Sequence, residues 1–395
     1  MTELNTNTAQ TIITALSGGT VPLEYAHTYS IGREEQMMVV CNEITEGRNR
    51  LRFINGDYGS GKTHFLAMIR HWCIENNFVP SHVVLSPRGA PLHDLTAVYS
   101  RIVKKFFLND NHVSPIESAF EYIFCAFQVW LKDYLTKELQ PRCQKYLLEP
   151  LYCEHCNNNG DIEEKYIKNF RFLDPRFQIA VILYRWARWG HNPDFDTADL
   201  VIRWLEGQTL YRQELNYLGL WDNLGTGDII KGLNEIAKLF SLFKKRGIVI
   251  MLDEAEGIEK LAQQQRREAY QNLHFLINAV KNNDKVFFLY ATTPTFFSDV
   301  RQYSSDLAAI IESTSQTNLN SLSVTEIKDL LTKITEIYLV SSDASLNEVQ
   351  KKLLDQNLRK FYNDYQVQGT MSVRNIITDV MTHFQQLAEK VSEAM

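Results

Sequence analysis

The sequence predicts an α/β fold with a parallel β-sheet, and three observations along the chain support this. A glycine-rich loop, residues 56–63, stands between an apolar strand pattern at 51–54 and a helical pattern of apolar residues that begins at Phe65. A second apolar run, 247–252, ends in two acids, as expected for a strand that is buried on both faces. A third strand pattern, 286–291, ends in two threonines.

The glycine-rich loop has the pattern G-x-x-x-x-G-K-[ST]. Glycines allow consecutive backbone N–H groups to curl around a phosphate, and the following helix N-terminus adds partial positive charge. Lys62 is expected to reach the β- and γ-phosphates of a nucleotide, and the Thr63 hydroxyl to bind Mg²⁺. An ordinary glycine turn is the alternative, and the flanking strand and helix patterns argue against it. The loop residues are Gly56, Asp57, Tyr58, Gly59, Ser60, Gly61, Lys62 and Thr63.

The two acids after the second strand predict the hydrolytic half of the site. Asp253 is expected to hold Mg²⁺ through water, and Glu254 to orient and deprotonate the attacking water, which distinguishes a hydrolase from a passive nucleotide binder. Solvated strand ends also carry acids, but the glycine-rich loop in the same chain favours the catalytic interpretation. Thr292 and Thr293 match the polar sensor that many such ATPases place near the γ-phosphate. Threonine hydroxyls also cap strand ends for local reasons.

Composition limits the remaining possibilities. With 395 residues the chain is long enough for two or three domains, and its net charge of −6 argues against a surface that binds nucleic acid everywhere. Contact with DNA would need a local basic surface, for which 244–246 and the pair Arg185 and Arg188 are candidates. No apolar run approaches the ~18 residues of a membrane span, and the polar start is no signal peptide. Six scattered cysteines are typical of reduced thiols, which predicts a cytoplasmic protein.

The patterns divide the chain into four segments. Residues 1–86 and 246–322 form the two halves of the nucleotide-binding core, 87–245 a mostly helical insertion, and 323–395 a helical lid. The insertion is far longer than an ordinary α/β connection. Aromatic residues beside its arginines are able to stack on nucleic-acid bases, although a helix core with a solvated face is the more common explanation. After residue 180 its tryptophans are Trp186, Trp189, Trp204 and Trp221.

One cysteine cluster in the insertion has part of the spacing of a metal site. Cys153 and Cys156 form a C-x-x-C pair, with His155 between them and Cys143 upstream. A second such pair is missing, so Cys143 and a histidine would have to complete a zinc site. Buried or loop thiols are the favoured interpretation.

The segment after residue 322 predicts the lid. Ser323 and Glu326 have the spacing of a capping box that opens a helix, and Ser372 is expected to cap a last helix with Arg374 in its first turn. A small helical lid after the acidic and sensor strands is the layout of AAA+ ATPases. In that family an arginine near the start of a lid helix contacts the nucleotide bound to the same subunit. Arg374 has this position, and a surface arginine is the alternative.

Five motifs make a more specific resemblance. They are, in order, Gly19–Pro22, Ile31–Glu34, Gly56–Leu66, Leu252–Glu256 and Ala291–Pro294. This series resembles the ATP-binding AAA+ proteins of BREX phage-defence islands, in particular the smaller, single-ATPase member, which are related to initiator-type and STAND ATPases. The resemblance implies a three-layer AAA+ P-loop core, ATP and Mg²⁺ as cofactors, and action with a helicase or other island proteins on DNA. It also implies that Ile31 and Gly32 lie beside the adenine and that His64 belongs to the nucleotide site.

Two classes of function remain. The first is an ATP-hydrolysing motor or switch, and the second is a scaffold that binds nucleotide, assembles and hardly turns over; Glu254 favours the first. A small-molecule kinase is disfavoured because no acceptor-substrate signature is present.

AAA+ sites usually lie between subunits of a homo-oligomer, where a neighbour's arginine completes the site. Arg301, the single basic residue of 294–316, is the first candidate for this arginine, and Arg266 and Arg267 are the others.

Overall fold

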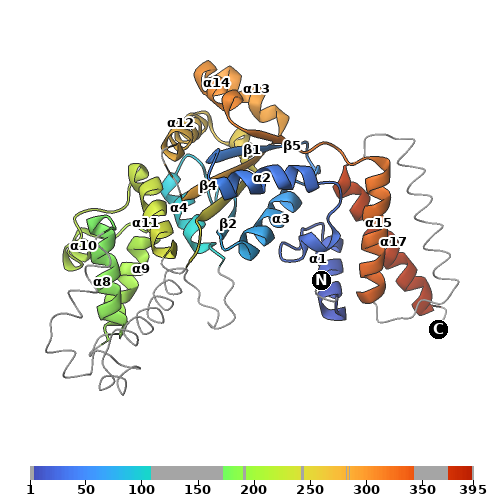
Figure 1. Ribbon diagram of the computed structural model, residues 1–395, viewed down its shortest axis with the longest axis horizontal. Helices are drawn as coiled ribbons and strands as arrows, with labels where there is room; N and C mark the ends of the chain where they lie inside the picture. Colours follow the sequence, from blue (N-terminus) through green and yellow to red (C-terminus); the bar gives the residue numbers. More distant parts are fainter. Residues whose placement is uncertain are drawn as a thin grey trace. The chain divides into compact units, whose positions relative to one another are not determined.

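The computed structural model shows a five-stranded parallel sheet among mostly helical elements, which confirms the predicted α/β class (Figure 1). The strand order is β2-β3-β4-β1-β5, so β4 separates β1 from β3. The strands are β1 (Leu51–Asn55), β2 (Val79–Val84), β3 (Ile248–Asp253), β4 (Val286–Thr292) and β5 (Gln316–Asn318). The structure describes residues 4–107, 172–189, 193–241, 244–281, 283, 285–341 and 372–393.

The chain forms two compact units, residues 1–72 with 290–395 and residues 73–289. This division follows contacts rather than sequence patterns, and the four-segment division proposed from the sequence stays a prediction. Helix α3 (Lys62–Glu75) begins in the first unit and ends in the second.

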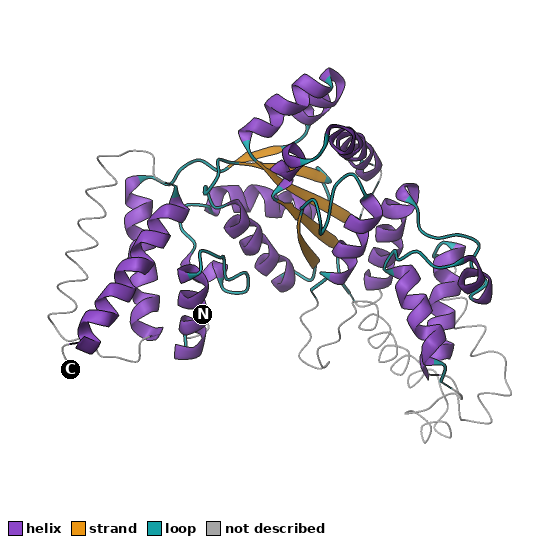
Figure 2. Cartoon of the chain, turned by 180° about the vertical axis from the view of Figure 1, so that it is seen from behind, coloured by secondary structure: helices purple, strands orange, loops and turns teal. Residues whose placement is uncertain are grey.

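The first unit pairs β1 with β5 in parallel, with Phe53 opposite Gln316. A separate apolar cluster joins the N-terminal helix to the two described lid helices, which lie side by side in Figures 1 and 2. Ile12, Ile334 and Phe384 are buried in this cluster. The helical elements of the unit are α1 (Thr6–Ser17), η1 (Ala26–Tyr29), α2 (Glu34–Glu46), α13 (Pro294–Tyr303), α14 (Ser305–Ser313), α15 (Val324–Ser341) and α17 (Val373–Glu393).

Both lid helices begin where the sequence predicts. The Ser323 hydroxyl accepts from the Glu326 N–H at 3.3 Å, and the Glu326 carboxylate accepts from the Ser323 N–H at 2.6 Å, which is the capping box. Ser372 accepts from the N–H of Asn375 at 3.3 Å and caps α17. Arg374 therefore lies in the first turn of this helix.

The second unit pairs β2 with β3 in parallel from Val79 opposite Ile248 to Val84 opposite Asp253. Strand β2 contains Pro80, which is tolerated because the strand stands at the end of the sheet order. Every residue of β3 is buried, as its apolar sequence predicts. The helices of this unit are α4 (Leu95–Lys104), α8 (Pro175–Trp189), α9 (Phe195–Leu205), α10 (Arg212–Tyr217), η4 (Thr226–Asp228), α11 (Ile229–Ser241), η5 (Ala255–Lys260) and α12 (Gln263–Val280).

The described part of the insertion is helical, as expected, and has its own core. Trp204 is fully buried and meets Phe177 edge-on, with ring centroids 5.3 Å apart. Trp221 is half exposed, and the side chains of Trp186 and Trp189 lie outside the described residues. Within the described ranges, no helix combines the length and the apolar character of a membrane span.

Candidate nucleotide-binding site

The phosphate loop connects β1 to α3 and takes its shape from two glycines. Gly59 and Gly61 have φ values of +78° and +93°, a conformation that side chains disfavour. A Cβ at Gly61 would meet nothing within 4 Å, so the backbone conformation alone requires glycine there. A Cβ at Gly59 would lie 2.7 Å from Ser372, so this glycine also makes room for the start of α17.

Lys62 opens α3, and its side chain is folded against its own loop. Its Nζ donates to the carbonyl oxygens of Gly56 at 2.9 Å and Asp57 at 3.2 Å, and the residue is 8% exposed. The ammonium group is thus held at the loop, next to a helix N-terminus that favours anions. The donor set of glycine N–H groups, lysine and threonine hydroxyl fits a nucleotide phosphate with Mg²⁺.

The end of β4 lies against the start of the same loop. The Gly56 N–H donates to the carbonyl oxygen of Thr292 at 3.2 Å. Thr292 is fully buried, and its hydroxyl has no hydrogen-bond partner among the described residues. The Thr293 hydroxyl instead pairs with the Thr295 hydroxyl at 2.7 Å. Of the two predicted sensor residues, Thr292 is therefore the one with a free polar group beside the loop.

The start of α17 meets the tip of the loop. Arg374 donates through Nη1 to the Tyr58 hydroxyl at 2.7 Å and through Nη2 to the Gly19 carbonyl at 3.4 Å. Its guanidinium carbon also lies 5.5 Å from the centre of the Tyr58 ring. The contacts place the predicted lid arginine next to the loop, and they explain why a motif at Gly19 accompanies the loop motif.

The Ile31–Glu34 motif lies between the loop and the lid. Arg33 is buried, and its Nη2 donates to the Ser60 carbonyl at 3.1 Å and the Asn320 carbonyl at 2.8 Å. Gly32 has φ +66°, and a Cβ there would lie 2.0 Å from the carboxylate of Glu326. Ile31 packs against the apolar cluster of the lid. Its position beside the adenine stays a prediction.

His64 lies near the Ile31–Glu34 motif, close enough to Arg33 to be affected by its charge. Its ring makes a tilted contact with Tyr29, with centroids 4.7 Å apart. Burial, and secondarily the charge of Arg33, lowers the pKa of His64 to about 4. The imidazole is thus neutral at physiological pH and fills space beside the loop without adding charge.

In the second unit, Asp253 ends β3 and is almost fully buried at 1% exposed. Its Oδ1 accepts from the N–H of Glu254 at 2.9 Å, and its Oδ2 lies 3.2 Å from Nε2 of His82 on β2. Sequence reasoning missed His82, because the register that sets β2 against β3 is not visible in either segment alone. The one available signal for a role of His82 was its position within an otherwise mostly apolar strand, β2.

Magnesium at phosphate sites needs only one or two carboxylates together with phosphate oxygens and water. Within the described ranges, no group of three or more His, Cys, Asp or Glu side chains is arranged to hold a metal. Thr63 of the first unit and Asp253 of the second unit are each of the kind that a nucleotide-bound Mg²⁺ uses, so the chemistry of each donor fits this ion.

Glu254 has an unusual backbone. Its φ of 54° and ψ of 39° lie in the left-handed region, which glycine and asparagine adopt far more readily than glutamate. The residue is exposed, and its carboxylate has no partner in the described part of the chain. Strained conformations of this kind cluster at functional sites. The strain directs an acid that directly follows the buried Asp253 into solvent.

The three arginines that are candidates for completing the nucleotide site of a neighbouring subunit have different surroundings. Arg301 lies in the last turn of α13 and pairs with Glu312 at 2.7 Å. Arg266 donates to the backbone carbonyls of Glu259 and Leu261. Arg267 is exposed.

The basic candidates for DNA contact are only partly described. Arg188 lies over the ring of Phe195 at 5.1 Å, and Arg246 lies over that of Phe78 at 4.8 Å. The side chain of Arg185 lies outside the described residues, as do Cys143, Cys153, His155 and Cys156 of the possible zinc cluster.

The sheet and the loop between β1 and α3 define a P-loop nucleotide-binding protein of the α/β class. The family described as BREX system ATP-binding protein BrxC/D matches residues 4–393, and the chain therefore belongs to this family. Membership confirms the resemblance inferred from the five motifs. It also supports the prediction that the chain binds a nucleotide and that this nucleotide is ATP. No curated protein matches the chain.

Proposed function

We propose that the protein hydrolyses ATP and works as a AAA+ motor or switch in BREX phage defence, together with partner proteins on or near DNA. Glu254 carries the hydrolytic part of this proposal. It follows the buried Asp253 directly, holds a strained left-handed backbone, and presents a carboxylate that has no partner among the described residues. A protein that only binds nucleotide gains nothing from such an acid.

Each residue then has a distinct task. The loop N–H groups and Lys62 bind the phosphates, while Thr63 and Asp253 hold Mg²⁺, which supplies charge neutralisation when bound. Glu254 accepts a proton from the attacking water, and the free hydroxyl of Thr292 orients that water or the γ-phosphate. Arg374 contacts the nucleotide in the same subunit.

The wider role rests on family membership and on the resemblance noted from the sequence. We propose a homo-oligomer in the cytoplasm whose ATP cycle moves or gates a partner such as a helicase. Any contact with DNA would come from a local basic surface and would weaken steeply with salt. Residues 244–246 and Arg188 are the described candidates for this surface.

Phosphate release measured with and without Mg²⁺ tests the hydrolytic proposal. Lys62→Ala is expected to lose both ATP binding and hydrolysis, because its ammonium contacts the phosphates in the ground state. Glu254→Gln is expected to keep ATP binding, measured by equilibrium dialysis, and to lose hydrolysis by about 10²-fold or more. Glu35→Gln makes the same chemical change at an exposed position of α2 and is the matched control. Hydrolysis by Glu254→Gln at the wild-type rate would contradict the assignment.

Light scattering after size exclusion, on Glu254→Gln with and without ATP and duplex DNA, tests assembly while hydrolysis is blocked. A larger particle with ATP supports the oligomer, and co-elution with DNA at low salt supports action on DNA. ATP-dependent assembly of a wild-type protein that releases no phosphate would favour the scaffold instead.

A further inference from the structure

The described part of the insertion carries a cluster of exposed aromatic side chains around α10. Phe195 is 60% exposed, Tyr211 79%, Tyr217 65% and Trp221 52%. Most large apolar side chains of a folded domain are buried, and several exposed ones close together mark an interaction site. We call these four residues the α10 surface.

Hydrogen bonds connect the four residues into one surface. The Tyr217 hydroxyl, at the end of α10, lies 3.2 Å from the carboxylate of Asp194, the residue directly before Phe195. At the other end of α10, Arg212 follows Tyr211 and donates to the Trp221 carbonyl at 2.7 Å. One aromatic pair therefore stands at each end of this short helix.

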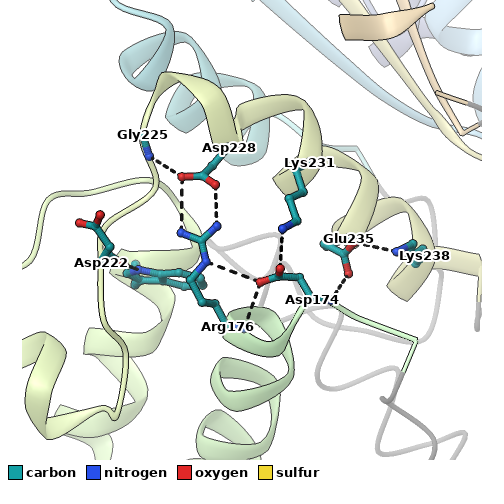
Figure 3. A network of polar contacts seen from close by, with 9 residues as sticks. Asp174, Arg176, Asp222, Gly225, Asp228, Lys231, Glu235 and Lys238 are labelled. Atoms are coloured by element: carbon teal, nitrogen blue, oxygen red, sulfur yellow. Dashed lines mark hydrogen bonds and ion pairs between the residues drawn. The ribbon is translucent and has the colours of Figure 1, made fainter. Parts of the chain in front are cut away.

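The α10 surface rests on a fixed base, which Figure 3 shows in part. Arg176 at the start of α8 pairs with Asp228 at 2.5 Å, and Asp174 pairs with Lys231 of α11 at 2.6 Å. The buried Trp204 donates through Nε1 to the Asp222 carbonyl at 3.0 Å, directly after Trp221. A surface that is already ordered loses little conformational entropy when a partner binds.

The segment that carries most of the α10 surface has more acidic than basic residues. Residues 193–228 contain no lysine and two arginines, Arg203 and Arg212. Arg203 pairs with Glu214 at 3.5 Å, and Arg212 is bound to the Trp221 carbonyl. The acids of the same segment are Asp194, Asp196, Asp199, Glu206, Glu214, Asp222 and Asp228.

Two of these acids are free to bind a cation. Asp196 and Asp199 are exposed on α9, and neither carboxylate has an ion-pair partner in the described part of the chain. Such a surface repels the phosphates of nucleic acid and attracts basic side chains. Among basic side chains, the planar guanidinium of arginine stacks best on aromatic rings. Arg188 already lies in this way over Phe195, at 5.1 Å from the ring centre.

We propose that the α10 surface is a docking site for an arginine-containing segment of a protein partner. Guanidinium groups of the partner stack on Tyr211, Tyr217 and Trp221, and pair with Asp196 and Asp199. The proposal stands on the insertion alone and does not depend on ATP hydrolysis.

Fluorescence anisotropy on the full chain tests this proposal. The probe is a labelled peptide of about a dozen residues in which arginine and leucine alternate, with a second peptide that has glutamate in place of arginine. The arginine peptide is expected to bind, and the glutamate peptide is not. Binding should weaken about tenfold in Tyr211→Ser/Trp221→Ser and in Asp196→Asn/Asp199→Asn, as loss of interface anchors does. Met38→Ser/Val39→Ser, at exposed apolar positions of α2, is the control and should bind as the wild type does.

Three results would overturn the proposal. One is equal affinity of the wild type and both surface variants for the arginine peptide. A second is binding of single-stranded oligo-dT that the aromatic variant Tyr211→Ser/Trp221→Ser abolishes, which would make the surface a nucleic-acid site. The third is a wild-type dimer that the variants dissociate, which would make it a contact between copies of this chain. The exposed Asp196→Asn/Asp199→Asn pair removes charge without removing packing, so the test remains valid if the aromatic variant fails to fold.

Discussion

The guanidinium of Arg374 donates to the hydroxyl of Tyr58 at 2.7 Å, and this bond joins the first turn of lid helix α17 to the tip of the phosphate loop. The same guanidinium lies over the Tyr58 ring and reaches the carbonyl of Gly19. Three segments that are distant in sequence therefore meet at one arginine. A change in the position of α17 must break or remake contacts of the glycine-rich loop.

We expect Arg374→Ala to weaken ATP binding about tenfold, because the substitution removes the cation that we propose contacts the nucleotide. Tyr58→Phe removes only the hydroxyl and keeps the ring under the guanidinium, so we expect a change of about threefold or less. Titration with a fluorescent ATP analogue measures both. Unchanged affinity and unchanged hydrolysis in Arg374→Ala would make Arg374 a surface residue with no part in the nucleotide site.

The sequence predicted the loop, the two apolar strands that follow and the caps of the lid because each depends on neighbours in the chain. Glycines, an apolar run and a capping box are local signals. The contacts of Arg33 and His82 were not predictable in this way. Arg33 binds the carbonyl of Asn320, and His82 meets Asp253, and both contacts depend on strand order and packing.

The pair of His82 and Asp253 leads to a second prediction. If Nε2 of His82 holds the Asp253 carboxylate in place, His82→Ala should lower kcat about tenfold and raise the Mg²⁺ concentration needed for half-maximal rate, with ATP affinity nearly unchanged. His82→Gln retains a side-chain donor and should recover part of the rate. His274→Ala, at an exposed histidine of α12, is the control. A normal Mg²⁺ dependence in a folded His82→Ala protein would argue against the positioning role.

The ion pair of Arg176 and Asp228 gives a prediction on stability and pH. The hydrogen bond from Arg176 is the largest cause that lowers the pKa of Asp228 below its usual value. Because the pKa of Asp228 is lower in the folded protein than in the unfolded chain, its carboxylate stabilises the folded protein fully at pH values above the unfolded-state pKa of about 4. This stabilisation is lost as the pH falls through the folded-state value, because protonation then favours the unfolded chain.

Asp228→Asn should therefore destabilise the second unit by about 2 kcal/mol at pH 7, and the difference from the wild type should shrink in acid. Hydrogen–deuterium exchange of α8 and α11 measures this, since a chain with two units need not unfold in one step. Asp222→Asn is the control, because within the described ranges the Asp222 carboxylate accepts only from the neighbouring N–H of Asn223. An equal difference at pH 7 and in acid would exclude the ion pair as its source.

The last prediction concerns an arginine that completes a neighbour's site. Arg301 lies in the last turn of α13 with its side chain 66% exposed, and it pairs with Glu312, whose side chain is 48% exposed. Exposed ion pairs contribute little to stability, so Arg301 can exchange this partner for a γ-phosphate at small cost. An arginine supplied by a neighbouring subunit is worth ~10³-fold or more in rate.

Arg301→Ala and Lys62→Ala should each be inactive alone, and their mixture should recover part of the hydrolysis. Mixed interfaces then pair the intact loop of one subunit with the intact arginine of another. Glu312→Gln removes the ion pair but keeps Arg301, so this variant should stay active. Arg267→Ala, which changes an exposed arginine on α12, tests the competing assignment in the same assay. Full activity of Arg301→Ala on its own would exclude Arg301, and recovery with Arg267→Ala in place of Arg301→Ala would move the role to α12.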